Sequence, residues 1–137
     1  MKTLIIYRSI MGASKQYATW LHEAVPSDML SYRSANSQRL GQYDTVVLIC
    51  GIYATRLSLV GYIQKNWEIL KRKRVILISV AGSPEDNIFS TKAYSRIPED
   101  IRTSIRHFHL QGKVGPIGAS KVKNQNLKPV LDYLASQ

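Results

Sequence analysis

Residues 44–50 read Asp-Thr-Val-Val-Leu-Ile-Cys, and this apolar run is the clearest central β-strand in the chain. Two similar runs are Thr-Leu-Ile-Ile-Tyr at residues 3–7 and Arg-Val-Ile-Leu-Ile-Ser-Val at residues 74–80. Continuous apolar runs of this kind are typical of parallel strands that are covered on both faces. Residues 27–33 form a weaker, more polar strand candidate that suits a position nearer the sheet edge, and residues 109–117 predict the last strand.

Helical patterns separate these strands along the chain. Apolar side chains recur at helical spacing in residues 14–23 and 60–70. A closing helix is marked by Leu127, Val130, Leu131 and Leu134. Pro98 predicts the start of a helix with one apolar face, formed by Ile101, Ile105 and Phe108. Residues 34–40 hold a short helix or a turn, and residues 81–93 have no strong period and predict a loop.

This alternation of strand and helix predicts an α/β fold. Parallel strands need crossover connections, which are right-handed and place helices on both faces of the sheet. We therefore expect a single doubly wound, five-stranded parallel sheet with helices on both faces. The 137 residues contain neither an internal repeat nor a low-complexity linker, so residues 1–137 are expected to form one domain.

Composition argues against several classes of protein. Apolar residues make up 45% of the chain and charged residues 20%, which is ordinary for a folded domain and argues against global disorder. The one cysteine, Cys50, excludes an internal disulfide and a zinc site built from cysteines. The first ten residues lack a signal-peptide pattern, and no apolar stretch approaches the roughly 18 residues of a spanning helix. We therefore expect a cytoplasmic protein.

The net charge points toward anionic partners. Nineteen Lys and Arg residues against nine Asp and Glu residues give +10. Such an excess favours a phosphate-bearing cofactor, nucleic acid or an acidic lipid surface, without choosing among them. The basic residues are scattered along the chain and accompany no recognised nucleic-acid motif, which argues against nucleic acid as a partner.

Three loops are expected to form the ligand site. In doubly wound sheets, ligands bind beyond the carboxyl ends of the strands, near the point where the strand order reverses. Residues 8–15, 51–58 and 81–87 each follow one of the three most apolar strands. We therefore expect these loops to gather at one edge of the sheet.

The first loop has the features of a phosphate site. It reads Ser9-Ile10-Met11-Gly12-Ala13-Ser14-Lys15 and runs directly into a helix, whose free N–H groups and positive dipole end favour an anion. Ser9 and Ser14 add hydroxyl donors, and Gly12 permits a tight turn. The Walker pattern and the GxGxxG fingerprint are both absent. In the alternative without a ligand, Ser14 caps the helix and Gly12 turns the chain.

The loops resemble those of a known family. Residues 7–15, Tyr-Arg-Ser-Ile-Met-Gly-Ala-Ser-Lys, look like the phosphate loop of flavodoxins, Ser/Thr-x-Thr-Gly-x-Thr, with Met11 in place of a hydroxyl residue. Residues 50–56, Cys-Gly-Ile-Tyr-Ala-Thr-Arg, resemble the second loop of a flavodoxin subgroup that includes menaquinone-dependent protoporphyrinogen oxidase. That subgroup often has glycine where Thr55 stands. Residues 97–113 contain stretches that are also similar to this subgroup.

The resemblance implies that the ligand is FMN. It places the phosphate on residues 9–15 and the isoalloxazine ring between residues 51–56 and 81–85. Tyr53 would stack on the ring or border it, and Gly82 would let the backbone approach the pyrimidine edge. The implied cofactor-binding residues are Ser9, Ile10, Met11, Gly12, Ala13, Ser14, Lys15, Gly51, Ile52, Tyr53, Ala54, Thr55, Ala81, Gly82 and Ser83. The flavin itself carries the electrons, so no general base or nucleophile is required.

Other reactive side chains are expected to serve the structure. His107 and His109 have no carboxylate or cysteine at metal-ligand spacing, so we predict ordinary surface or half-buried histidines and no metal site. Cys50 ends a buried strand and is predicted to lie in the core. The basic run at residues 71–74, Lys-Arg-Lys-Arg, is predicted to be a solvated connection at the end of the sheet opposite the flavin.

Three functions are compatible with these features. The favoured one is an FMN-binding, flavodoxin-like electron-transfer protein whose redox partner presents an acidic surface. The second is a flavoenzyme similar to protoporphyrinogen oxidase that passes electrons to a quinone, since a basic surface suits peripheral contact with an anionic membrane. The helical insertion of that enzyme has no clear counterpart here. The third is a basic module that binds nucleic acid without a flavin.

Overall fold

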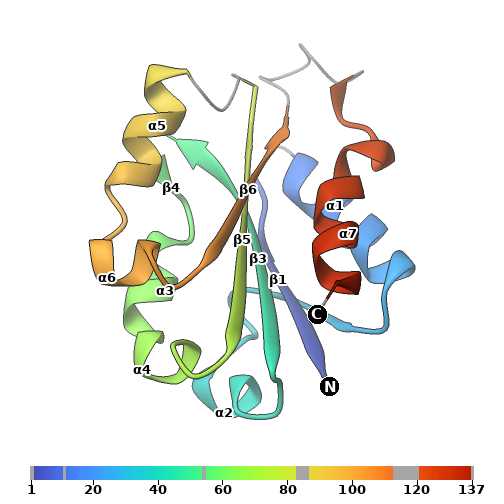
Figure 1. Cartoon of the computed structure of the whole chain (residues 1–137), viewed down its shortest axis with the longest axis vertical. Helices are drawn as coiled ribbons and strands as arrows, with labels where there is room; N and C mark the ends of the chain where they lie inside the picture. Colours follow the sequence, from blue (N-terminus) through green and yellow to red (C-terminus); the bar gives the residue numbers. More distant parts are fainter. Residues whose placement is uncertain (1, 11, 54, 83–86, 113–120, 137) are drawn as a thin grey trace.

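A sheet that is parallel except for one short strand forms the centre of the structure (Figure 1). The computed structural model describes residues 2–10, 12–53, 55–82, 87–112 and 121–136. The strands are β1 Thr3–Arg8, β2 Asp28–Ser31, β3 Thr45–Tyr53, β4 Arg56–Leu57, β5 Arg74–Ala81 and β6 Arg106–Gln111. The parallel strands follow the order β2-β1-β3-β5-β6, and β4 pairs antiparallel with the end of β3. The predicted five-stranded parallel sheet is confirmed, with the more polar β2 at its edge.

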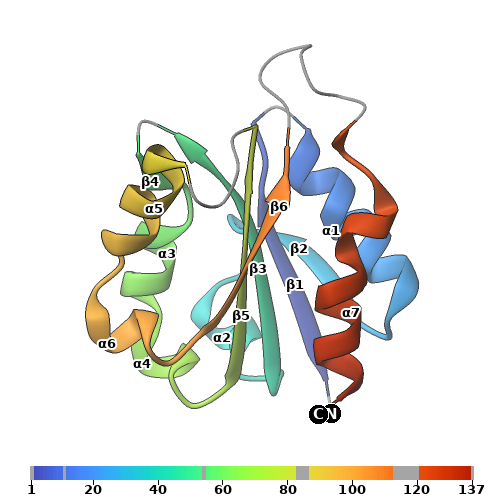
Figure 2. The ribbon, with the colours of Figure 1, turned by 45° about the horizontal axis from the view of Figure 1, so that its top comes forward.

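Helices cover both faces of this sheet, as predicted for a doubly wound α/β fold. They are α1 Ala13–Ala24, α2 Ser37–Leu40, α3 Val60–Lys65, α4 Trp67–Leu70, α5 Ile88–Ser95, α6 Glu99–Arg102 and α7 Lys128–Ala135, with the 3₁₀-helix η2 Asn124–Leu127 directly before α7. Figure 2 shows α1 and α7 on one face and α3 to α6 on the other. Leu40 of α2 packs on the same face of the sheet as α3 to α6. Within the described ranges, no helix is long and apolar enough to cross a lipid bilayer.

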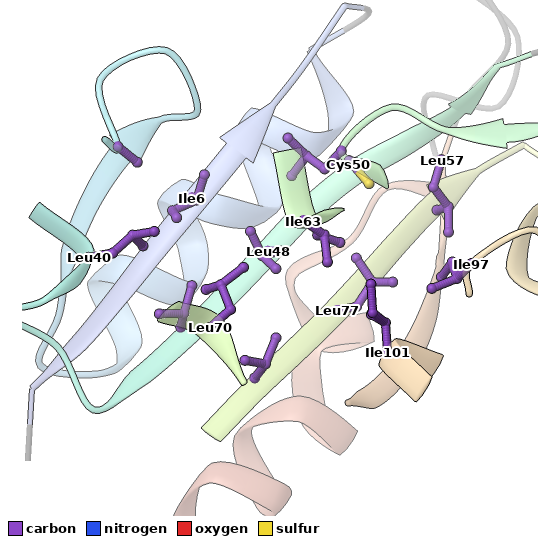
Figure 3. Packing of buried hydrophobic residues seen from close by; sticks show 14 of the residues in the cluster. Ile6, Leu40, Leu48, Cys50, Leu57, Ile63, Leu70, Leu77, Ile97 and Ile101 are labelled. Atoms are coloured by element: carbon purple, nitrogen blue, oxygen red, sulfur yellow. The ribbon is translucent and has the colours of Figure 1, made fainter. Parts of the chain in front are cut away.

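The sheet separates two hydrophobic clusters, because successive side chains of a strand point to opposite faces. Toward α2 to α6, Ile6, Leu48 and Leu77 come from three adjacent strands and pack with Leu40 and Ile63 (Figure 3). Toward α1 and α7, the cluster includes Ile5, Val47, Ile78, Tyr17 and Leu21. All ten of these side chains have no exposed area, so the central strands are buried on both faces.

The predicted helix over residues 60–70 is interrupted at Asn66. The Asn66 Nδ2 donates a hydrogen bond of 2.9 Å to the Tyr62 carbonyl, which also accepts the Asn66 backbone N–H at 3.1 Å. An asparagine side chain that binds the nearby backbone competes with continuation of the helix. The chain therefore restarts as α4 at Trp67. The apolar stripe continues across the interruption, since Ile63 and Leu70 are both fully buried.

The chain between β5 and β6 differs from the prediction in its first part. A loop is predicted over residues 81–93, but α5 begins at Ile88, so the prediction is wrong from that residue onward. The described side chains that α5 buries most deeply are small ones, Ser90 and Ala93. A small polar and a small apolar residue leave no apolar stripe in the sequence that would predict a helix.

The second part of this connection also differs. The helix predicted from Pro98 ends at Arg102, and β6 begins at Arg106 rather than at His109. Ile105 packs on the α2–α6 face of the sheet and Phe108 on the opposite face, so the two cannot share one face of a helix. The rest of the predicted strand, residues 113–117, lies outside the described residues.

A cluster of three polar side chains joins β5 to β6. Ser79 is 1% exposed, and its Oγ lies 2.8 Å from His107 Nε2 and 2.9 Å from His109 Nδ1. The Tyr94 ring of α5 stacks on His107 with a centroid separation of 4.4 Å. Burial, with a smaller contribution from the charge of His109, lowers the pKa of His107 to about 4. Both histidines are half-buried, as predicted.

The turn between β3 and β4 contains a residue in an unfavourable conformation. Tyr53 pairs with Arg56, so two residues connect the strands, and the second of these, Thr55, has φ of 62°. Left-handed backbone is costly for a β-branched residue, and glycine or asparagine is usual in such turns.

We expect Thr55→Gly to raise the free energy of unfolding by about 0.5–1 kcal/mol. Relief of left-handed strain is worth about 1–2 kcal/mol, and the greater entropy of glycine in the unfolded chain offsets part of it. Urea denaturation measures the change. Thr103→Gly is the matched control, because Thr103 has φ of −77° and its hydroxyl binds the Glu99 carbonyl. This control should lower stability, and a loss in both variants would contradict the strain.

We also expect stability to fall between about pH 6.5 and pH 4. In this window the unfolded chain binds a proton at residue 107 that the folded chain, with a His107 pKa of about 4, does not bind. Linkage then removes about 2–3 kcal/mol as the pH falls, and nothing further from this group below pH 4. Urea denaturation of His107→Gln should give a flatter pH dependence. A pH dependence in His107→Gln equal to that of the wild type would refute the assignment.

Candidate functional site

Three strands end at the same edge of the sheet, and α1 begins there (Figure 1). The register places Arg8 of β1 opposite Cys50 of β3, and Gly51 of β3 opposite Val80 of β5. The strand order reverses between β1 and β3, because β2 lies on the far side of β1. Crevices at such a reversal bind ligands in open α/β sheets.

The first loop turns tightly into α1. Gly12 has φ of 92° and precedes the first helical residue, and its N–H donates a hydrogen bond of 3.1 Å to Ser9 Oγ. Ser14 is therefore not the N-cap, and the alternative in which it caps the helix is wrong. It is the second residue of α1 and is 4% exposed, while Lys15 beside it is exposed.

This loop has room for a ligand next to neutral donors. A Cβ built on Gly12 would have no atom within 4 Å. The first N–H groups of a helix have no partner within the helix, and here these are the amides that begin at Ala13. Ile10 is 63% exposed, which is unusual for a large apolar side chain. The start of α1 thus offers several N–H groups, a hydroxyl and an apolar contact in one place.

The second loop is held by the ring of Tyr53. A Cβ on Gly51 would lie 2.8 Å from Tyr53 Oη and 2.9 Å from two ring carbons, so the ring lies directly against the glycine backbone. The backbone of Ile10 is close enough to the Tyr53 hydroxyl to lower its pKa, although by less than burial raises it. Burial raises the pKa of Tyr53, although the side chain is still 37% exposed. Tyr53 therefore lies between the first and second loops.

Arg8, at the end of β1, stabilises the second loop through a hydrogen bond. Its Nη1 donates a hydrogen bond of 2.8 Å to the Ser58 carbonyl, and the Ser58 N–H binds the Gly51 carbonyl at 3.0 Å. Cys50 is fully buried beside them, and burial raises the pKa of its thiol to about 11. The prediction that Cys50 belongs to the core is confirmed. A protonated, inaccessible thiol cannot act as a nucleophile.

The third loop is anchored by the end of the neighbouring strand, β6. Gln111 Nε2 donates to the Gly82 carbonyl at 2.7 Å, and the Gly112 N–H donates to the Ala81 carbonyl at 2.6 Å. The Tyr17 hydroxyl donates to the Gln111 carbonyl at 2.5 Å and accepts from Asn126 Nδ2 at 2.9 Å. Helix α1 and η2 thus fix the end of β6 and, through it, the start of the third loop.

Most of the predicted site residues lie at this edge. Met11, Ala54 and Ser83 are outside the described residues. The sequence-based prediction includes Arg8 at the start of the first loop, but it gives no supporting role to Arg8, Gln111 or Tyr17. Tyr17 lies on the apolar stripe of a helix, so the sequence indicates a core residue and gives no sign of the hydrogen bonds that its hydroxyl forms.

The described part of the chain offers binding groups rather than a catalytic cluster at this edge. It contains no group of three His, Cys, Asp or Glu side chains that could hold a metal ion. The basic run ends at the opposite end of the sheet, where Lys71 pairs with Glu68 at 2.7 Å and Arg74 Nη2 donates to the Tyr133 carbonyl at 3.1 Å.

Comparison with known proteins agrees with this fold. Three similar solved structures are a flavodoxin from Megasphaera elsdenii (18% identity, TM-score 0.62, covering 90% of this chain and 95% of that one), a flavodoxin from Streptococcus pneumoniae (14%, 0.64, 99% and 99%) and an azoreductase from Bacillus anthracis (8%, 0.64, 100% and 100%). At these identities they establish the fold. No curated protein matches the sequence significantly. The family model described as "Flavodoxin domain" matches residues 4–123, which include all three loops. The chain therefore belongs to the flavodoxin domain family.

Proposed function

We propose that the protein binds FMN at the carboxyl edge of its sheet and transfers electrons through it. The observation that carries this proposal is the start of α1. Gly12, in left-handed backbone with open space where a Cβ would lie, exposes the first N–H groups of the helix. A phosphate monoester fits such a group of neutral donors without a lysine clamp.

The remaining loops have roles in holding the ring. When FMN is bound, it supplies the redox chemistry. Tyr53, which lies against Gly51 and close to Ile10, presents its exposed face to the isoalloxazine ring. Gln111 binds the Gly82 carbonyl and thereby positions the backbone of the third loop against the pyrimidine edge.

The surface charge supports an acidic redox partner. The net charge is +10, and Lys15 and Arg56 are exposed beside the first and second loops. Complementary charge accelerates encounter more than it tightens the complex. We therefore propose a partner protein with an acidic surface around its own redox centre, and expect their electron-transfer rate to fall as salt is added.

A flavoenzyme of the protoporphyrinogen oxidase type is the second candidate. Its support is the basic surface, which suits an anionic membrane, together with the similar second loop at Ile52-Tyr53. Oxidation of protoporphyrinogen with menaquinone as the acceptor would separate this enzyme from an electron carrier.

Titration of FMN into the flavin-free protein tests both candidates together. We expect quenching of flavin fluorescence with a one-to-one endpoint. The absence of binding at millimolar FMN would overturn the proposed function and favour a basic module without a flavin.

The first loop should dominate the affinity for FMN. Ser14→Ala removes one buried hydroxyl donor to a charged phosphate, which should cost about 1.5–3 kcal/mol, or roughly 10- to 150-fold in Kd. Gly12→Val strains the left-handed turn and should weaken binding further. Ser104→Ala is the matched control, because its exposed hydroxyl binds the Asp100 carbonyl in α6. Wild-type titrations for both loop variants would remove this loop from the site.

Tyr53 should affect both the affinity for FMN and its potential. Tyr53→Ala should weaken binding by about 0.5–1.5 kcal/mol, the size expected for an aromatic pair. The lower midpoint potential should rise, because an electron-rich phenol against the ring disfavours added negative charge. Tyr53→Phe keeps the ring and should retain most of the affinity.

Gly51→Ala provides an independent check of this role. Its Cβ would collide with the Tyr53 ring at 2.8–2.9 Å, so this variant should reproduce the loss seen in Tyr53→Ala. Wild-type affinity and potentials in Tyr53→Ala would show that this side chain does not touch the flavin.

A further inference from the structure

A cavity lies between the segment that follows β2 and helix α3, and Arg8 is the residue that it shares with the first loop. Its volume is about 480 Å³, within the range of small-molecule sites. Three cationic side chains line it: Arg8 from the end of β1, Arg33 from the segment after β2, and Lys65 from the end of α3. The lining among the described residues includes no Asp or Glu. We call this cavity the basic cleft.

No carboxylate of the described residues forms an ion pair with the three cations of the basic cleft. The ion pairs among the described residues are Glu68–Lys71 and Lys128–Asp132, and neither involves the cleft. Arg8 donates to the Ser58 carbonyl, and Arg33 Nε donates to Tyr32 Oη at 3.2 Å. Each guanidinium keeps further N–H groups beyond these contacts. Like charges around one cavity repel each other, and a bound anion would relieve this repulsion.

Aromatic rings form the walls between these charges. The Arg8 and Arg33 guanidinium carbons lie 4.7 Å and 5.7 Å from the centroid of the Tyr32 ring. The Tyr62 hydroxyl donates to the Ala35 carbonyl at 2.5 Å, which fixes the opposite wall. Both tyrosines are half-buried. Guanidinium groups that lie over an aromatic ring present flat, charged surfaces, and these suit a planar group that carries a negative charge.

We propose that the basic cleft binds a small organic anion, a planar body bearing a phosphate or carboxylate group. The site is built from side chains with formal charge, whereas the start of α1 offers neutral backbone donors. It is separate from the proposed FMN site, although Arg8 contacts both the cleft and the second loop. Its existence does not depend on FMN binding.

Calorimetric titration with phenyl phosphate tests this proposal on the full chain. Phenyl phosphate combines an aromatic ring with a phosphate, and we expect it to bind. In nitrogen–proton NMR spectra, the Gly61 amide signal should shift on binding, because Gly61 lines the cleft. Benzoate should bind too, inorganic phosphate should bind more weakly than phenyl phosphate, and neutral benzyl alcohol should not bind. Absence of binding at 10 mM, or equal binding of benzyl alcohol, would overturn the proposal.

Two variants and a matched control locate the site. Arg33→Gln and Lys65→Gln should each weaken phenyl phosphate binding about tenfold or more, the effect of losing one bond to a charged group. Arg72→Gln removes an exposed cation at the opposite end of the sheet and should leave the affinity unchanged. Wild-type affinity in both cleft variants would place the probe elsewhere and refute the site.

Titration in the presence of saturating FMN separates this inference from the proposed function. The phenyl phosphate affinity should be the same with and without FMN, because the cleft shares only Arg8 with the loops and none of the residues proposed to contact FMN lines it. Competition between FMN and phenyl phosphate would refute a separate site. If the protein does not bind FMN, the titration of phenyl phosphate into the flavin-free protein still tests whether the basic cleft binds an anion.

Discussion

The burial of β3 on both faces is the constraint on which the rest of the structure depends. Its first seven residues, from Thr45 to Gly51, are all buried, and it pairs with β1 on one side and β5 on the other. A strand in this position can exchange hydrogen bonds with nothing but its neighbours, so its register sets where each of them ends. The common edge at Arg8, Gly51 and Val80 follows from that register. The three loops lie close together because they leave the sheet at this edge.

The parts of the fold that can be predicted from sequence are the buried strands, because each is a continuous run of apolar residues. The strand at residues 44–50 needs no knowledge of its partners, because polar residues are excluded from both faces. The second half of the chain is harder to predict for a physical reason. In β6, His107 and His109 are polar yet face inward, and they are accommodated because Ser79 on the neighbouring strand binds both. Helix α5 buries Ser90 and Ala93, and these small residues do not form the apolar stripe by which a helix is predicted from sequence.

The site divides in the same way. Turn chemistry is local, so the tight turn at Gly12 can be predicted from the sequence. The left-handed backbone of Thr55, with φ of 62°, lies in a similarly short turn. The residues that hold the loops are not local. Tyr17 and the Gln111 carbonyl that it binds are 94 positions apart, and Arg8 reaches Ser58 across 50 positions. A single sequence contains no signal for such pairs, since each member has an ordinary alternative role in the core or at the surface.

The position of Ser79 between two histidines has a consequence for where protons reside. A hydroxyl group has one hydrogen to donate, so it cannot donate to His107 Nε2 and His109 Nδ1 at once. With both contacts below 3 Å, at least one ring must carry its own hydrogen toward the serine oxygen. The Ser79 oxygen also lies 3.4 Å from the Phe108 carbonyl, which is a further acceptor for its one hydrogen. The two imidazoles therefore cannot both accept a hydrogen bond from Ser79, and whenever one ring accepts its hydrogen, the other ring must donate to the serine oxygen.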